Sequence, residues 1–142
     1  MAIWKSAFDL ESLNAINGKE TIGGYIGIEF TEFGDDYLIA KMPVDHRTRQ
    51  PMGLLHGGAS VVLAETLGSV ASVLCLEDWT KKAAVGLEIN ANHLSSARNG
   101  WVYGTVKPIR VGRTVHVWNI EIRDEKGKMI CISRLTTSII DI

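Results

Sequence analysis

Neither sign of charge is in excess in this 142-residue sequence, whose 15 lysines and arginines balance 16 aspartates and glutamates for a formal net charge of −1. Nucleic-acid-binding domains usually carry a clear basic excess, so nucleic acid is not expected as the main partner. A local basic patch for a phosphate-bearing ligand stays compatible with this balance. The length is typical of one domain with its own core, and we expect a single domain over residues 1–142.

Cysteine is scarce, and neither Cys75 nor Cys131 belongs to a CxxC or Cys/His pattern of the kind that binds structural zinc. No metal site is predicted. Two buried thiols in a reducing compartment are favoured, although the sequence alone leaves a disulfide open. The N-terminus lacks the basic and apolar regions of a signal peptide. The longest apolar stretch, residues 59–76, holds Glu65 with serines and glycines, which predicts that it is too polar to span a membrane. We expect a soluble, cytoplasmic protein.

Several catalytic motifs are also missing. Residues 58–62 do not form the GxSxG elbow of serine hydrolases. The sequence has no Walker A or GxGxxG run, so nucleotide hydrolysis and dinucleotide chemistry lack support.

The sequence does contain one long helical pattern among strands. The helix begins at Gly57 or Gly58, runs to about Leu76 and is apolar on almost every side, which predicts a buried helix. A short helix capped by Asp9 or Ser6 is predicted over residues 10–16. Strands are predicted over residues 25–33, 37–44, 84–94, 101–111, 114–123 and 128–140. Only the strands can cover the helix, which favours an α+β architecture, the hotdog fold, with a curved antiparallel sheet wrapped around one helix. Its open edges predict an oligomer.

The carboxylate of Glu65 is the most conspicuous side chain of this helix, because an unpartnered buried carboxylate costs several kcal/mol. Ser69 and Ser72 follow it on the same helical face. The pattern fits either a catalytic carboxylate in a cleft or a buried carboxylate that a core neighbour satisfies.

Gly57 and Gly58 lie at the start of the same helix, where free N–H groups and the positive end of the dipole stabilise an oxyanion. They fit a simple glycine helix start equally well. Gly57 and Glu65 are about 12 Å apart along a helix, too far to act together on one reacting atom. We therefore predict that two subunits share the active site, one supplying Gly57 and the other Glu65.

Three pieces of sequence occur together: Gln50, the run HGGA at residues 56–59 with Glu65, and the run GLEINANH at residues 86–93. Over about residues 20–140 this combination resembles the hotdog acyl-CoA thioesterases, in the bacterial branch that acts on aromatic acyl-CoA esters. The resemblance implies an aromatic acyl group of the 1,4-dihydroxy-2-naphthoyl or benzoyl type, no cofactor beyond the CoA of the substrate, and a homotetramer.

The resemblance also implies roles for individual residues. Glu65 corresponds to the catalytic carboxylate, as nucleophile or general base, and Gly57 to the backbone donor to the thioester oxygen. Gln50 and His56 correspond to residues at the thioester carbonyl, and Ser69 to a helper for the water or the carboxylate.

The resemblance also implies that Gly86 and two groups of residues contact the CoA, the first at residues 93–98 and the second at residues 110–115. Arginine forks, serines and backbone N–H groups in these groups suit phosphates. The predicted contacts are Gly86, His93, Leu94, Ser95, Ser96, Arg98, Arg110, Val111, Gly112, Arg113, Thr114 and Val115. Solvated strand ends would produce similar clusters.

Two other functions stay open at this level. A hotdog dehydratase or hydratase pairs a loop histidine with a helix carboxylate, but here His56 directly precedes the glycines and the His-Phe-Pro loop is missing. A non-catalytic acyl-CoA-binding module would share the fold and the ligand without turnover.

Overall fold

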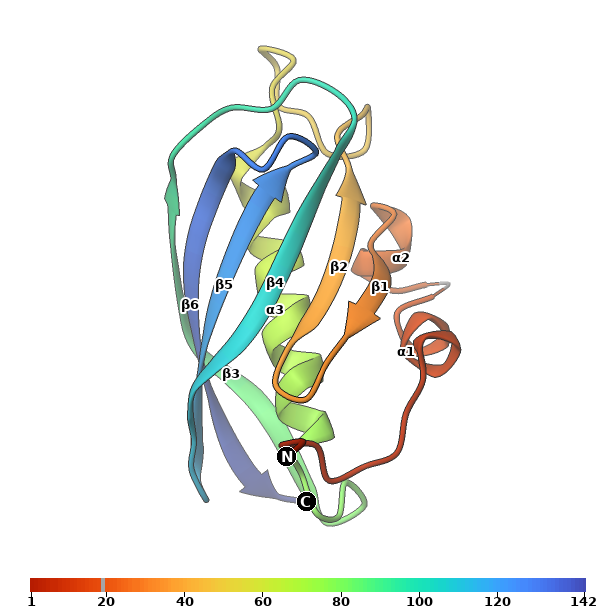
Figure 1. Ribbon diagram of the computed structural model, residues 1–142, viewed down its shortest axis with the longest axis vertical. Coiled ribbons are helices and arrows are strands. Elements are labelled where there is room, and N and C mark those ends of the chain that lie inside the picture. The colour runs from red at the N-terminus through yellow and green to blue at the C-terminus, as the bar shows by residue number, and fades with distance from the viewer. Residues whose placement is uncertain (19) are drawn as a thin grey trace.

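The computed structural model describes residues 1–18 and 20–142 and contains one antiparallel sheet with one long helix against it (Figure 1). The elements in chain order are α1 (Leu10–Ile16), α2 (Ile22–Tyr25), β1 (Glu29–Phe33), β2 (Leu38–Pro43), α3 (Gly57–Leu74), β3 (Lys82–His93), β4 (Trp101–Val111), β5 (Val115–Asp124) and β6 (Met129–Asp141). The strand order in the sheet is β1-β2-β4-β5-β6-β3. The predicted α+β hotdog architecture is confirmed.

Helix α3 packs on the sheet through a buried stripe that includes Leu63, Leu67 and Ala71. The approach to β4 is very close, because a Cβ on Gly104 would lie 2.7 Å from the Leu67 side chain. Each fully buried leucine contributes roughly 2 kcal/mol to stability. By length and composition alone α3 is apolar enough to cross a membrane, so the prediction that its polar residues exclude a span was wrong on that criterion. Its packing against the sheet makes it the core helix of this domain.

The N-terminal part of the chain differs from the prediction at Tyr25. The strand expected from residue 25 begins only at Glu29, and Tyr25 ends α2 instead. Thr21 caps this short helix by accepting a hydrogen bond from Gly24 N–H at 3.1 Å. Gly27 then turns the chain with φ of +81°. Helix α1 is capped by Asp9, one of the two predicted residues, through Ser12 N–H at 2.7 Å.

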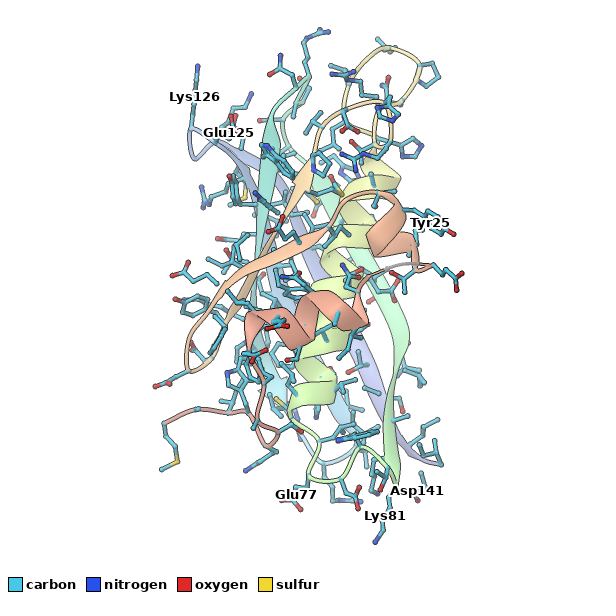
Figure 2. All side chains as sticks on the ribbon, turned by 90° about the vertical axis from the view of Figure 1, so that its right-hand side faces the viewer. Tyr25, Glu77, Lys81, Glu125, Lys126 and Asp141 are labelled. Atoms are coloured by element: carbon cyan, nitrogen blue, oxygen red, sulfur yellow. The ribbon has the colours of Figure 1, made fainter. Side chains whose placement is uncertain are left out.

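The two edges of the sheet are finished differently. Asn14 of α1 lies against β1, where its Nδ2 donates to Phe30 O at 3.0 Å and its Oδ1 accepts from Phe30 N–H at 2.7 Å. Figure 2 looks onto the molecule from this side, with Tyr25 of α2 projecting into solvent. Strand β3 forms the other edge, and none of its twelve residues is buried.

Candidate active site

The start of α3 leaves one backbone donor free. His56 is the N-cap, and its Nδ1 accepts a hydrogen bond from Gly58 N–H at 2.7 Å. The carbonyl of His56 accepts from Ala59 N–H at 3.0 Å and from Ser60 N–H at 3.3 Å. Within residues 1–18 and 20–142, Gly57 N–H has no acceptor. A free N–H at the positive end of a helix is suited to an oxygen that carries negative charge.

Gln50 faces the same region from the loop before α3. Its Oε1 accepts a hydrogen bond from Met52 N–H, so the amide NH₂ remains available as a donor. A pocket of about 400 Å³ is lined by Gln50, Leu54, Leu55, Gly57, Ser60, His93, Leu94, Ser95, Ser96 and Ile130. The structure thus gathers Gln50 and Gly57 with residues 93–96 of the first predicted CoA group in one pocket, while Arg98 lines a neighbouring one.

His93 explains the glycine at position 57. A Cβ on Gly57 would lie 2.8 Å from His93 Nε2, so the imidazole at the end of β3 occupies the space of a side chain. The ring and the free N–H therefore adjoin in one pocket.

Glu65 lies in the middle of α3, half-exposed and directed at β3. A Cβ on Gly86 would lie only 2.6 Å from Glu65 Oε2. Gly86 adjoins a β-bulge, because the pairing of β3 with β6 shifts between Gly86 and Glu88. Among the described residues the Glu65 carboxylate has no hydrogen-bond or ion-pair partner. The alternative of a buried carboxylate satisfied by a core neighbour is therefore wrong.

The two serines that follow Glu65 have different surroundings. Ser69 is half-exposed, one turn beyond Glu65. Ser72 is fully buried, where its Oγ accepts from Trp118 Nε1–H at 2.7 Å and lies 2.8 Å from Thr137 Oγ1. Ser72 holds α3 onto the sheet and does not face a ligand, so the polar stripe predicted through both serines ends at Ser69.

The predicted site residues divide into two places on one chain. The helix is continuous from Gly57 to Leu74, so Gly57 and Glu65 are about 12 Å apart. The second predicted CoA group, residues 110–115, lies at the opposite end of the domain from the Gln50 pocket. There Val111, Gly112 and Arg113 line a pocket of about 610 Å³ beside Cys75, at the C-terminal end of α3. One subunit does not bring the two CoA groups together.

Lysines 126 and 128 were not predicted, although they lie beside Arg98. A pocket of about 430 Å³ is lined by residues 96–99, Trp101, Asp124, Glu125, Lys126 and Lys128. The sequence signal was the turn over residues 124–127 with a lysine on either side of Gly127, but nothing in it places this turn next to residue 98. Within the described part of the chain, no three His, Cys, Asp or Glu side chains are grouped as metal ligands would be.

A family model described as the thioesterase superfamily matches residues 52–131. This chain belongs to the thioesterase superfamily. The matched segment runs from the loop before α3 into β6, so it includes both Gly57 and Glu65. The predicted resemblance and enzyme class, a thioester hydrolase, are confirmed.

Relatives match this thioesterase over almost its whole length. The 1,4-dihydroxy-2-naphthoyl-CoA hydrolase of Escherichia coli is 58% identical over 138 residues, which cover 97% of this chain and 99% of that protein. A proofreading thioesterase of Cronobacter turicensis is 49% identical, with 96% of this chain and 98% of that protein covered.

Solved structures agree with the fold. A Pseudomonas aeruginosa thioesterase, crystallised with a glutamine replaced by alanine, superposes with a TM-score of 0.96 at 51% identity, covering 99% of this chain and all of that one. A Staphylococcus aureus protein with a glutamate replaced by alanine gives a TM-score of 0.79 at 38% identity, covering 82% of this chain and 96% of that one. A second structure of the same protein carries an alanine in place of a glutamine 15 residues before that glutamate.

Proposed function

We propose that this thioesterase hydrolyses an acyl-CoA to the free acid and CoA, in a site that two subunits share. The observation that carries the proposal is a pair of unsatisfied groups on α3, the N–H of Gly57 and the carboxylate of Glu65. Each is the group that thioester hydrolysis requires, and the helix keeps them too far apart to meet within one chain.

A second copy paired along β3 would bring the two groups together. Strand β3 carries both Gly86, against Glu65, and His93, against Gly57. If two β3 strands run antiparallel across a twofold axis, the His93 end of one strand lies toward the Lys82 end of the other. Gly57 of one subunit then moves toward Glu65 of its partner. We further propose the tetramer, a dimer of such dimers.

The chemistry follows from the groups available. Gly57 N–H and the Gln50 amide donate to the thioester oxygen and stabilise the oxyanion that develops when the carbonyl carbon is attacked. Glu65 either removes the proton from an attacking water or attacks first and forms an anhydride that water then opens. The tetrahedral intermediate collapses with departure of the CoA thiolate, which takes up a proton. His56 adjoins the carbonyl, and Ser69 is placed to orient the water or the carboxylate.

Replacements in relatives support the assignment of Gln50 and Glu65. The two Staphylococcus aureus variants concern a glutamine and a glutamate 15 residues apart. Gln50 and Glu65 have the same separation. The substitution in the Pseudomonas aeruginosa structure is also of a glutamine.

An aromatic acyl group is the substrate that we propose. The similarity to the naphthoyl-CoA hydrolase supports it. So do the apolar side chains that flank Glu65 on the incompletely buried face of α3, which are Val61, Val62, Val70 and Val73. These valines offer an apolar surface to a planar ring. We propose that the reaction needs no metal or redox cofactor and takes place in the cytoplasm.

Subunit mixing tests the shared site. Glu65→Ala and Gly57→Pro are each expected to lower turnover by about three orders of magnitude, since one removes the carboxylate and the other the donor. Proline fits the first helical position, and Gly57→Ala is its steric control because it adds a Cβ beside His93 but keeps the N–H.

An equimolar mixture of the two inactive variants, after subunit exchange, should regain about a quarter of wild-type activity, because half of the dimers then hold one intact site. Thiol release from naphthoyl-CoA and benzoyl-CoA is the measurement. A confirmed mixed dimer without recovery would show that each chain acts alone, and a wild-type enzyme inactive on every acyl-CoA would reject the proposed substrate class.

A further inference from the structure

One buried hydroxyl group differs from the others in the described part of the chain. Four of the five buried serine and threonine side chains are hydrogen-bonded inside the domain, namely Thr48, Ser72, Ser133 and Thr137. The fifth, Ser60, is only 1% exposed, and its hydroxyl makes no hydrogen bond to any described residue. A buried hydroxyl without a partner destabilises a fold, so a partner from outside the chain is expected.

The Ser60 hydroxyl faces the pocket that contains Gln50 and Gly57. Ser60 lies three residues after Gly57 on α3, and helical side chains lean toward the N-terminus of their helix, so its oxygen lies beside the first turn. Ser60 is one of the residues that line the pocket of about 400 Å³. Among the described residues, His116 Nδ1 is the one sealed side-chain atom without a partner, so the Ser60 oxygen keeps its contact with the pocket. A ligand in this pocket therefore meets the hydroxyl.

The walls of the pocket limit what this ligand group can be. Four apolar side chains line it together with Ser60, namely Leu54, Leu55, Leu94 and Ile130. Such walls suit a ring with one polar substituent better than a charged group. In the proposed mechanism the thioester oxygen already accepts from Gly57 N–H and from the Gln50 amide, which together use its two lone pairs. The partner of Ser60 is then a second polar atom of the substrate, close to that oxygen.

We infer that Ser60 makes this thioesterase selective for aromatic acyl groups that carry a hydroxyl ortho to the thioester. The inference rests on the proposed function, because it concerns the acyl group of the same substrate. The ring fixes an ortho hydroxyl at about 2.5–3 Å from the carbonyl oxygen, whereas a para hydroxyl points away from it. With the carbonyl oxygen occupied by Gly57 and Gln50, the ring hydroxyl donates to Ser60 Oγ. A ring without this hydroxyl leaves Ser60 unpaired, and this difference provides the selectivity.

Three CoA esters that differ only in the ring hydroxyl test the inference: 2-hydroxybenzoyl-CoA, 4-hydroxybenzoyl-CoA and benzoyl-CoA. Wild-type enzyme should hydrolyse the 2-hydroxybenzoyl ester with a kcat/KM about tenfold above that of the 4-hydroxybenzoyl ester. The 4-hydroxybenzoyl ester is the control, since its hydroxyl has a similar electronic effect on the carbonyl but cannot reach Ser60. Ser60→Ala should lower kcat/KM about tenfold for the 2-hydroxybenzoyl ester and less than about twofold for the other two.

Thermal unfolding without substrate separates a ligand-binding role of Ser60 from a structural one. Ser60→Ala removes no hydrogen bond of the free protein, so its Tm should stay at the wild-type value or rise. Ser72→Ala is the matched control on the same helix, because it breaks the hydrogen bonds to Trp118 and Thr137. It should lower the Tm by about 3–8 °C and leave the ratio between the ortho and para esters unchanged.

Three results would overturn the inference. An equal loss on all three esters in Ser60→Ala would mean that Ser60 contacts a part of the substrate that the esters share. Unchanged kinetics in this variant would remove Ser60 from substrate recognition. A Tm lowered as far as in Ser72→Ala would make Ser60 a structural residue. A wild-type enzyme that hydrolyses none of the three esters would instead reject the proposed function.

Discussion

The two edge strands of the sheet show how the same structural problem is handled in opposite ways. Strand β1 has five residues, and α1 covers it with the Asn14 side chain, which occupies both backbone groups of Phe30. Strand β3 has twelve residues, no cover, and apolar side chains such as Leu87, which is 62% exposed. An edge of this length without protection favours pairing with another strand. The β1 edge is closed within the chain, whereas the β3 edge, which carries Gly86 against Glu65 and His93 against Gly57, is left open for the pairing that we propose.

The largest effect is expected from a charge placed on the open edge formed by β3. Leu87→Lys should separate the β3 pair and lower turnover at least about a hundredfold, because each half-site loses its complement. Ile22→Lys, on α2, replaces an isoleucine of almost equal exposure, 61%, and should change neither property. Light scattering and thiol release measure the two effects. A monomeric Leu87→Lys protein with full turnover would contradict a shared site.

The second prediction concerns Gly86, where β3 meets α3 at Glu65. Gly86→Ala should lower kcat about tenfold to a hundredfold, because the new Cβ collides with Glu65 Oε2 and displaces the carboxylate. Glu65→Asp shortens the side chain, so adding it to Gly86→Ala should cost less than the product of the two single effects. Strictly multiplicative losses would show that Gly86 acts independently of Glu65.

A third prediction addresses the closed edge. Asn14→Ala should reduce the free energy of unfolding by roughly 1–3 kcal/mol, since the backbone N–H and C=O of the buried Phe30 lose their partners. Turnover per folded molecule should stay unchanged. Urea unfolding and thiol release provide the comparison, and lost activity at unchanged stability would mean that α1 belongs to the site.

The smallest effect is expected inside the sheet, between the two edges. Burial lowers the pKa of His116, and the backbone carbonyl of Gly112 opposes this only in part. In the unfolded chain His116 has the ordinary histidine pKa of 6.5, so between pH 6.5 and the lower folded-state pKa the unfolded chain binds a proton more readily than the folded one. Stability therefore falls as the pH drops through this range. His116→Phe should flatten this slope in unfolding experiments between pH 5 and 7. An unchanged slope would assign the acid sensitivity to other groups.

Periodicity was sufficient to predict most of the fold. The strand alternation around Trp118 and the apolar helix after Gly57 each define an element, and the helix requires a sheet to cover it. The helix through Tyr25 was missed because a side-chain cap at Thr21 and a turn at Gly27 outweighed the local pattern.

For the site, the sequence predicted candidate chemical groups but not the contacts that surround them. Residue types and spacing made Gly57 and Glu65 candidates and the family resemblance added Gln50, but contacts between elements depend on register, which the sequence does not contain. The angular position of Ser72 gave its side of the helix but not the Trp118 ring that covers it. The proximity of Lys128 to Ser96 arises from the neighbouring strands β3 and β6, whose pairing no local pattern reveals.

The hydrogen bond between Gly58 N–H and His56 Nδ1 fixes the tautomer of the imidazole. With its only lone pair engaged by the helix, the neutral ring carries its hydrogen on Nε2. Toward a bound acyl group His56 is therefore restricted to polarising oxygen and has no means of deprotonating water. His56 is thus already committed as a hydrogen-bond acceptor of the helix, which in the proposed mechanism leaves the role of base to the Glu65 carboxylate.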